Sequence, residues 1–262
     1  MSTDHRAASS YAADVAHVER ETSRVLELAA ALPPAAPVPS RPAYTVAALV
    51  AHIGEGLQIA RSVLEGDVYS DASRPAAPSG PGLVEWTAEG RQSLLEAFRR
   101  VPRDKLVTLP YEVRQRPVGD AATSAAIYFG LHRWDLESVL GQHRPLPADI
   151  AVAAVDQAFD SYAPRLAGAG VAPIGGTLEF HATDVGAVSW TASVQDGRLA
   201  AGRADGTAAP DATVTATAEE LALLVLKRRP ALPPGEAVSG PRDILRRFLA
   251  INYIPDPRRP PH

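Results

Sequence analysis

Two histidines, His52 and His132, are the residues whose type and setting point most directly to chemistry. Each lies near the middle of a segment with helical periodicity, 46–66 and 121–141. Facing helices of a bundle place their inward side chains within reach of one another. Neutral imidazole binds zinc, nickel, iron or copper, and it also serves as a general base. The pair is therefore a candidate metal or acid–base site, and the plainer interpretation is two ordinary core or surface histidines.

Four long segments with apolar residues at three- and four-residue intervals would position these histidines. Such intervals are typical of amphipathic helices, and Thr45 is a candidate N-cap for the second segment. Together the segments predict an N-terminal antiparallel four-helix bundle, followed by a further helix at about 148–167. The four segments cover residues 11–31, 46–66, 83–100 and 121–141. The short stretch 106–118 lies between the third and fourth helices, and its residues favour β-structure.

The periodicity changes after a glycine-rich stretch at 168–176, where we place a boundary between domains 1–170 and 171–262. Short β-rich runs follow, and Asp196-Gly197 carries the signal of a tight hairpin. With two short helices, they predict a small α+β domain with an antiparallel sheet. The runs are 177–181, 187–195, 199–204 and 212–216, the helices 218–227 and 241–251. The tail 255–262 is expected to be frayed.

The composition and charge of the chain narrow the range of possible functions. The net charge of −4 is spread along the chain without a basic block, which argues against a nucleic-acid partner. No apolar stretch approaches the length needed to cross a membrane, and no signal peptide is evident, so we expect a cytoplasmic protein. The chain has no cysteine, which removes protein thiolates both as ligands and as nucleophiles. Any sulfur chemistry must therefore use the thiol of a separate small molecule.

Specific strings carry a resemblance to a known family. The stretch from Tyr44 to Gly54, with its Val-Ala-His ending at His52, and the string His132-Arg-Trp-Asp135 resemble two motifs of the mycothiol-dependent maleylpyruvate isomerases and their DinB-like relatives. Further strings, near Asp184, Asp211, Leu224 to Pro230 and Ser239, resemble the partner domain of that family, which has a sterol-carrier-like fold. The resemblance covers nearly the entire chain and implies an actinobacterial source.

The resemblance implies a metal, usually zinc, held by a histidine on the second helix and by a glutamate or histidine and a histidine four residues apart on the fourth. His52 and His132 match two of these positions. Tyr128 stands where the glutamate is expected. A phenol is a poor ligand at neutral pH because it must first lose a proton. Either a phenolate or water completes the site, or Glu55 or Asp135 is recruited, or the metal has been lost.

The resemblance also implies a chemistry and a substrate contact. In the family, an ionised thiol adds to the double bond of maleylpyruvate, and is eliminated after rotation about the resulting single bond. Arg228 and Arg229 are the nearest match to an arginine of the second domain that closes over anionic substrate. The plainer interpretation is that both merely complement a helix dipole. Tyr128 would donate a hydrogen bond to a developing oxyanion, or simply fill the core.

Three functions remain open for this sequence. The first is a mycothiol-dependent isomerase or S-transferase that acts on a small acidic or electrophilic metabolite. The second is a diverged, metal-independent enzyme of secondary metabolism that performs isomerisation, cyclisation or elimination in the same pocket. The third is a small-molecule binding protein without catalysis. All three expect a small-molecule partner and neither nucleic acid nor membrane, and the sequence leaves the oligomeric state open.

Overall fold

A computed structural model describes residues 11–110, 112, 114–166, 170–206, 209–229 and 237–251. The chain divides into two compact units, Met1–Leu146 and Pro147–His262, and each is described by itself. The proline- and arginine-rich tail 255–262 lies outside the described residues.

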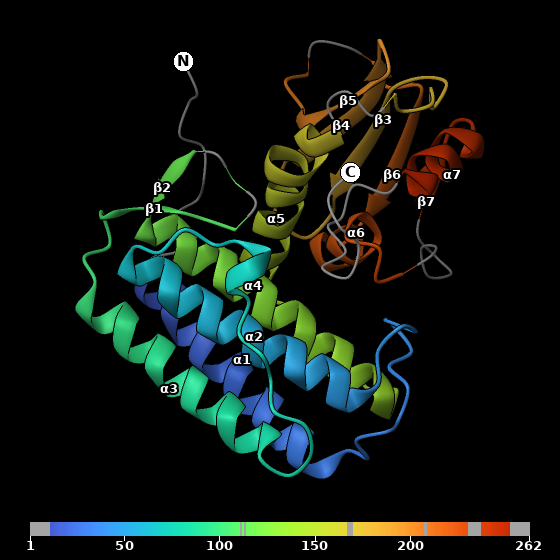
Figure 1. Cartoon of the computed structure of the whole chain (residues 1–262). Coiled ribbons are helices and arrows are strands. Elements are labelled where there is room, and N and C mark those ends of the chain that lie inside the picture. The colour runs from blue at the N-terminus through green and yellow to red at the C-terminus, as the bar shows by residue number, and fades with distance from the viewer. Residues whose placement is uncertain are drawn as a thin grey trace. The chain divides into compact units, whose positions relative to one another are not determined.

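The first unit is the expected helical bundle (Figure 1). Thr45 caps the second helix by accepting a hydrogen bond from the Ala48 N–H at 3.2 Å. That helix ends at Gly66, whose φ of 115° is readily adopted only by glycine. Its core stripe consists of Leu49, Ile53 and Leu57, each at most 1% exposed. The four helices are α1 (Tyr11–Ala31), α2 (Val46–Glu65), α3 (Leu83–Arg100) and α4 (Val118–Glu137).

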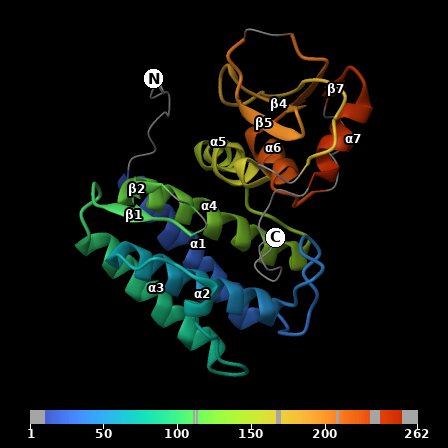
Figure 2. The same cartoon turned by 45° about the horizontal axis from the view of Figure 1, so that its top comes forward.

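The four helices do not simply alternate in direction. Asp14 pairs with Thr123 near the starts of α1 and α4, and Arg24 meets Glu137 near their ends, so these two helices are parallel. In the same way Gly54 packs on Trp86, and Glu65 pairs with Arg100, so α2 and α3 are parallel. Figure 2 shows α1 beside α4 and α2 beside α3.

The two parallel pairs run in opposite directions, since Arg91 of α3 bonds Thr22 of α1 while Tyr11 reaches the Phe98 carbonyl. The up-down-down-up order has a consequence for the connection at residues 66–82. This segment must return along the length of α2 before α3 can begin. It includes one short 3-10 turn, η1 (Asp71–Ser73).

Between α3 and α4 the β-leaning stretch forms a two-stranded antiparallel hairpin, β1 (Leu106–Thr108) and β2 (Gln115–Pro117). A 3-10 turn, η2 (Ser138–Leu140), closes α4 and ends at Gly141. Among the described residues, no helix has both the length and the apolar character that crossing a membrane requires.

The second unit is an α+β fold with a five-stranded sheet in the order β5-β4-β3-β6-β7. Asp196 and Gly197 both have positive φ, as a tight turn between β4 and β5 requires. Three neighbouring pairs of strands are antiparallel, as expected, and one pair, β3 and β6, is parallel. The strands are β3 (Leu178–Ala182), β4 (Val188–Gln195), β5 (Arg198–Arg203), β6 (Ala212–Ala216) and β7 (Ala237–Ser239).

The sheet buries alternate residues of its central strands β3, β4 and β6. Phe180 of β3 contacts Phe248 and Phe159, with ring centroids 5.1 Å and 5.9 Å away. The helical elements are α5 (Ala148–Gln157), which continues into the π-helical turn η3 (Ala158–Tyr162) and the 3-10 turn η4 (Ala163–Leu166), then α6 (Ala218–Val225) and α7 (Arg242–Ala250).

The division between the units falls earlier in the chain than the sequence pattern indicates. The change of periodicity places it near residue 170, whereas the compact units meet after Leu146. Asp156, at the end of α5, accepts hydrogen bonds from the Trp190 indole and the Arg203 guanidinium of the sheet. A helix bonded in this way to β4 and β5 belongs to the second unit, although its own sequence is that of any amphipathic helix.

Candidate functional site

The antiparallel packing of α2 against α4 brings the two histidines together. The ring centroids of His52 and His132 are 5.0 Å apart, and the rings meet edge to face at 85°. His132 is 3% exposed, while His52 is only partly buried. Both come from long helices whose core stripes fix their rotation, so the approach of the rings is set by the packing of the bundle.

Tyr128 lies one helical turn before His132 and contacts both imidazoles. Its ring centroid is 4.4 Å from that of His132 and 5.7 Å from that of His52. The hydroxyl donates a hydrogen bond to the His52 backbone carbonyl at 3.1 Å. Burial raises the pKa of Tyr128 well above its usual value, and the nearby Tyr44 and Glu55 act in the same direction. The phenol therefore remains protonated.

Gly56 makes room for this tyrosine. A Cβ atom at position 56 would lie 2.7 Å from both the hydroxyl oxygen and a ring carbon of Tyr128. Such a distance is far inside van der Waals contact, so only glycine lets the ring lie against α2. The hydrogen bond to His52 and the glycine one turn later thus fix Tyr128 between the two helices.

His132 has a carboxylate partner on its own helix. Its Nδ1 atom lies 3.0 Å from Oδ2 of Asp135, a residue with no exposed surface. The other carboxylate oxygen accepts a hydrogen bond from the Ser40 hydroxyl at 2.8 Å. A buried carboxylate on Nδ1 sets the orientation of an imidazole, makes Nε2 its basic nitrogen and stabilises the imidazolium form.

Glu55 does not join the histidines. Its Oε2 atom lies 3.4 Å from Nε of Arg74, which comes from the connection between α2 and α3. Burial raises the pKa of Glu55, and the positive charge of Arg74 only partly offsets this effect. Tyr44 also packs on His52, with the two ring centroids 5.7 Å apart. The guanidinium of Arg41 stacks over the Tyr44 ring.

Among the residues just described, two imidazoles could bind a metal ion, but no third side chain beside them is available as a metal ligand. In the described part of the chain, no group of three or more histidine, aspartate and glutamate side chains has the geometry to hold a metal ion. Asp135 is already bonded to His132 and Ser40, Glu55 forms an ion pair with Arg74, and the Tyr128 hydroxyl donates a hydrogen bond to a carbonyl. Catalytic metal sites normally use three protein ligands, so the donor set does not fit a resident zinc.

The two arginines expected to bind substrate lie in the second unit, after α6. Arg229 forms an ion pair with Glu220, with the Nη1–Oε2 distance at 2.6 Å. Arg228 is 9% exposed and donates to the Leu226 carbonyl. The preceding Lys227 donates to the Leu249 carbonyl at the end of α7, and burial lowers its pKa to about 8.

Sequence reasoning missed the role of Asp135. Its spacing of three residues from His132 indicates only a candidate metal ligand. The structure places its carboxylate on the imidazole instead. Ser40 was not singled out, because nothing in a proline-rich connector signals that its hydroxyl reaches a carboxylate 95 residues away. His181 lies on β3 and bonds Ser189 of β4, and Trp190 of β4 is buried.

Comparisons with known proteins agree with the fold. Residues 15–137 match the family described as the mycothiol maleylpyruvate isomerase N-terminal domain, and residues 149–247 match its C-terminal domain. A crystal structure of a point mutant of the mycothiol-dependent maleylpyruvate isomerase is similar, with a TM-score of 0.60 and 12% identity. A second structure of that isomerase has a TM-score of 0.56 and 13% identity. Each covers 91% of this chain and 96% of its own. A comparison with curated proteins yields no match.

Proposed function

The chain belongs to the mycothiol-dependent maleylpyruvate isomerase family, and we propose that it is a thiol-dependent isomerase or S-transferase. Its thiol is mycothiol, and its substrate is a small acidic or electrophilic metabolite. The observation that carries the proposal is the contact between His52 and His132, with Asp135 bound to the second imidazole. Two helices bring these side chains together inside a bundle whose fold is shared with a thiol-dependent isomerase.

The proposed enzyme ionises its thiol with a base rather than with a metal. The unsuitable donor set around the histidines supports this choice, as does the carboxylate on His132. A histidine held by a buried carboxylate takes a proton readily, because the imidazolium that forms lies beside a negative charge. His132 is therefore the general base, and His52 positions the incoming thiol beside it.

The isomerisation balances without any further reactant. The thiol proton passes to Nε2 of His132, and the thiolate adds to the double bond conjugated with the substrate carbonyl. Rotation about the new single bond follows, and elimination of the thiolate restores the double bond in the trans geometry. The thiolate then recovers its proton from His132. An S-transferase differs only in the last step, where the proton goes to the substrate carbon and the conjugate is released.

Tyr128 takes a positioning role in this scheme. Its hydroxyl is bonded to the His52 carbonyl, which argues against the expected donation to an oxyanion. Arg228 and Arg229 remain proposed contacts for a substrate carboxylate. The ion pair of Arg229 with Glu220 partly neutralises its charge, so of the two we favour Arg228 for this role.

The test combines metal analysis with turnover. The purified, untagged protein is treated with a chelator and assayed with maleylpyruvate and mycothiol, following formation of the trans product by NMR. We expect the chelated protein to retain its activity and His132→Gln to lose it. His52→Gln should mainly raise the KM for the thiol. Elemental mass spectrometry measures the metal content of each sample.

Three results would change the proposal. Near-stoichiometric metal that His52→Ala and His132→Ala abolish, together with chelator-sensitive turnover, would replace the general base by a metal. Turnover of maleylpyruvate that does not require any thiol would point to the metal-independent enzyme of secondary metabolism. Folded protein that binds small acids without turning them over would identify a binding protein instead.

A further inference from the structure

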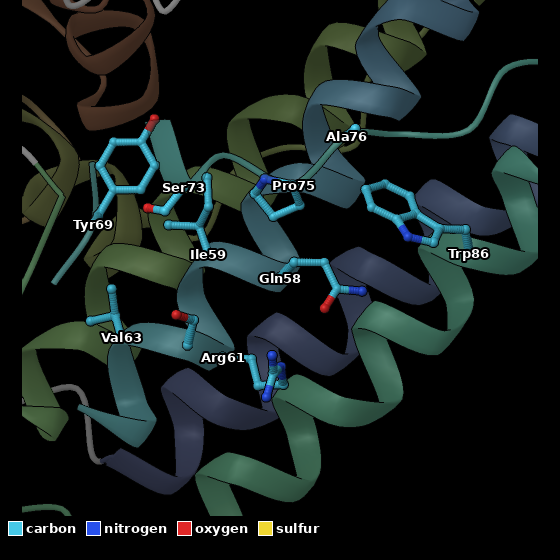
Figure 3. Close-up of a pocket in the computed structure, with 10 residues that line it drawn as sticks. Gln58, Ile59, Arg61, Val63, Tyr69, Ser73, Pro75, Ala76 and Trp86 are labelled. Carbon is cyan, nitrogen blue, oxygen red and sulfur yellow. The ribbon is translucent and has the colours of Figure 1, made fainter. Parts of the chain in front are cut away.

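A pocket of about 380 Å³ lies on the first unit, away from the two histidine rings. Its walls come from α2, from the start of α3 and from the connection between them (Figure 3). We call it the α2–α3 pocket, and its lining consists of Gln58, Ile59, Arg61, Ser62, Val63, Tyr69, Ser73, Pro75, Ala76 and Trp86.

We propose that the α2–α3 pocket binds a polyhydroxylated, sugar-like group. In this proposal the group is the sugar part of the thiol cosubstrate. The proposal rests on the proposed function for the identity of the ligand. Mycothiol joins its cysteine to a glucosamine–inositol disaccharide, so one molecule carries both a thiol and a hydroxyl-rich end. The pocket itself is assigned by its lining, its volume and its position.

The lining combines aromatic rings with hydrogen-bonding groups. Trp86 and Tyr69 offer flat faces on which the C–H face of a sugar ring can pack. The same lining contains the amide of Gln58, the guanidinium of Arg61 and the hydroxyl of Ser62. A volume of a few hundred Å³ with several polar groups converging on it is typical of a small-molecule site.

The donors and acceptors of this pocket differ in their availability. The Ser62 hydroxyl is bonded to Asp67, and Arg61 pairs with Glu65. Among the described residues, neither the Gln58 amide nor the Trp86 indole N–H forms a hydrogen bond to another group of the protein. Gln58 and Trp86 therefore retain polar atoms for a ligand, and they come from two different helices (Figure 3).

The position of the pocket fits a ligand that also reaches the histidines. Ile59 lies seven residues after His52 on α2, which is two turns, or about 10 Å, along the same side of the helix. Arg74 forms an ion pair with Glu55, which lies between these two positions, and is followed directly by Pro75 and Ala76 of the pocket wall. A cosubstrate with its thiol at His132 and its sugar two turns away would span this distance.

Two substitutions test the pocket in the full chain. Ala76→Trp places a bulky ring at an exposed position of the wall, and Gln58→Leu removes an amide while keeping the size of the side chain. Ala72→Trp is the matched control, because Ala72 is exposed on the same connection but does not line the pocket. KM is measured with maleylpyruvate for mycothiol and for N-acetylcysteine, which has no sugar.

We expect Ala76→Trp to raise the ratio of the mycothiol KM to the N-acetylcysteine KM about tenfold, because the indole blocks the sugar subsite and the smaller thiol does not use it; this change corresponds to about 1.4 kcal/mol. Gln58→Leu should raise the ratio several-fold, and Ala72→Trp should leave it unchanged. The second measurement is calorimetric titration with glucosaminyl-inositol, which lacks the thiol. We expect the wild-type chain and Ala72→Trp to bind it and Ala76→Trp not to.

The two readouts separate failure of the pocket from failure of the proposed function. Binding of glucosaminyl-inositol that Ala76→Trp abolishes, in a protein that turns over no thiol, would support the pocket and reject the proposed function. Thiol-dependent turnover with an unchanged KM ratio, and no binding of glucosaminyl-inositol to the wild-type chain, would overturn the pocket alone.

Discussion

At the scale of single residues, the site depends on polar atoms that satisfy one another inside the bundle. Asp135 accepts from Ser40 and holds His132, and Tyr128 holds the backbone at His52. A buried carboxylate without partners would be costly, so each of these contacts both stabilises the fold and sets an orientation. The chemistry and the packing therefore depend on the same few side chains.

Asp135→Asn tests the carboxylate on His132. The amide keeps the size of the side chain but removes the negative charge and can stabilise the wrong tautomer of the imidazole. We expect kcat to fall by about two to four orders of magnitude, as loss of such a carboxylate does elsewhere. Turnover with maleylpyruvate and mycothiol is the measurement, alongside the thermal midpoint of unfolding.

Ser40→Ala is the matched control for this experiment. It removes one hydrogen bond to Asp135 and leaves the charge in place, so we expect a loss of only about fivefold in kcat, which corresponds to roughly 1 kcal/mol. An Asp135→Asn protein that is folded and as active as Ser40→Ala would show that the carboxylate does not support a base.

Gly56→Ala tests the contact between Tyr128 and α2. The added methyl group would lie 2.7 Å from the tyrosine hydroxyl, so we expect a loss of roughly 1–3 kcal/mol in the free energy of unfolding. In a Tyr128→Ala background the clash is gone, and the same change should stabilise the protein by about 0.5–1 kcal/mol through helix propensity. The measurement is urea unfolding of the wild type, the two single variants and the double variant, which together form a double-mutant cycle. An equal effect of Gly56→Ala on the free energy of unfolding in both backgrounds would exclude the contact.

At the scale of elements, a buried charge network joins α1, α4 and the segment that follows α4. Arg133 is 2% exposed and bonds Glu21 of α1, Glu137 of its own helix and the Arg144 carbonyl. Glu137 also accepts the Arg144 N–H. The network fixes the rotation of α4 about its axis, which determines where His132 and Tyr128 point.

Glu137 makes the stability of this network depend on pH. Burial acts to raise its pKa, but the Arg144 N–H and the Arg133 guanidinium together outweigh it, and the net pKa is lowered. A lowered carboxyl pKa contributes stability that is present above the unfolded-state value of 4.5 and is lost as pH falls through the folded-state value. We expect the free energy of unfolding to decrease below pH 4.5.

Glu137→Gln is the variant that checks this prediction. At neutral pH it should cost roughly 3 kcal/mol, because Arg133 loses a buried partner. Below pH 4.5 its unfolding free energy should depend less steeply on pH than that of the wild-type protein. Glu65→Gln is the control, since Glu65 is exposed and pairs with Arg100, away from this network. An identical acid dependence in Glu137→Gln and the wild type would contradict the assignment.

The sequence predicts these elements better than it predicts their arrangement. Helical periodicity locates the four helices of the bundle, and inward histidines on α2 and α4 indicate a shared site. Periodicity contains no information on direction, so the parallel pairs of helices were not foreseen. The same holds for the sheet, where β6 returns beside β3 in parallel because a crossing segment separates it from β5. Contacts such as Ser40 with Asp135 join distant positions and leave no local signal.

At the scale of the whole chain, the division into units determines which residues act together. The family match spans both units, and the histidine site and the α2–α3 pocket both lie in the first. The assignment of α5 to one unit or the other determines where an isolated second domain would begin.

We expect the fragment 147–262 to be a more stable fold than the fragment 171–262. The longer fragment keeps Asp156, which accepts hydrogen bonds from Trp190 and Arg203, and Phe159, which contacts the rings of Phe180 and Phe248. Losing a buried aromatic side chain alone costs roughly 3 kcal/mol or more. Trp190 is the one tryptophan in either fragment, so its fluorescence during urea unfolding reports stability directly.

Asp156→Ala in the longer fragment separates the hydrogen bonds from the packing. It leaves the Trp190 indole without its acceptor, so we expect a loss of about 1–3 kcal/mol, less than deletion of the whole segment. Equal unfolding midpoints for 147–262 and 171–262 would place the boundary near residue 170, as the change in periodicity suggests. A less stable shorter fragment would show instead that α5, despite its bundle-like sequence, is part of the core of the second domain.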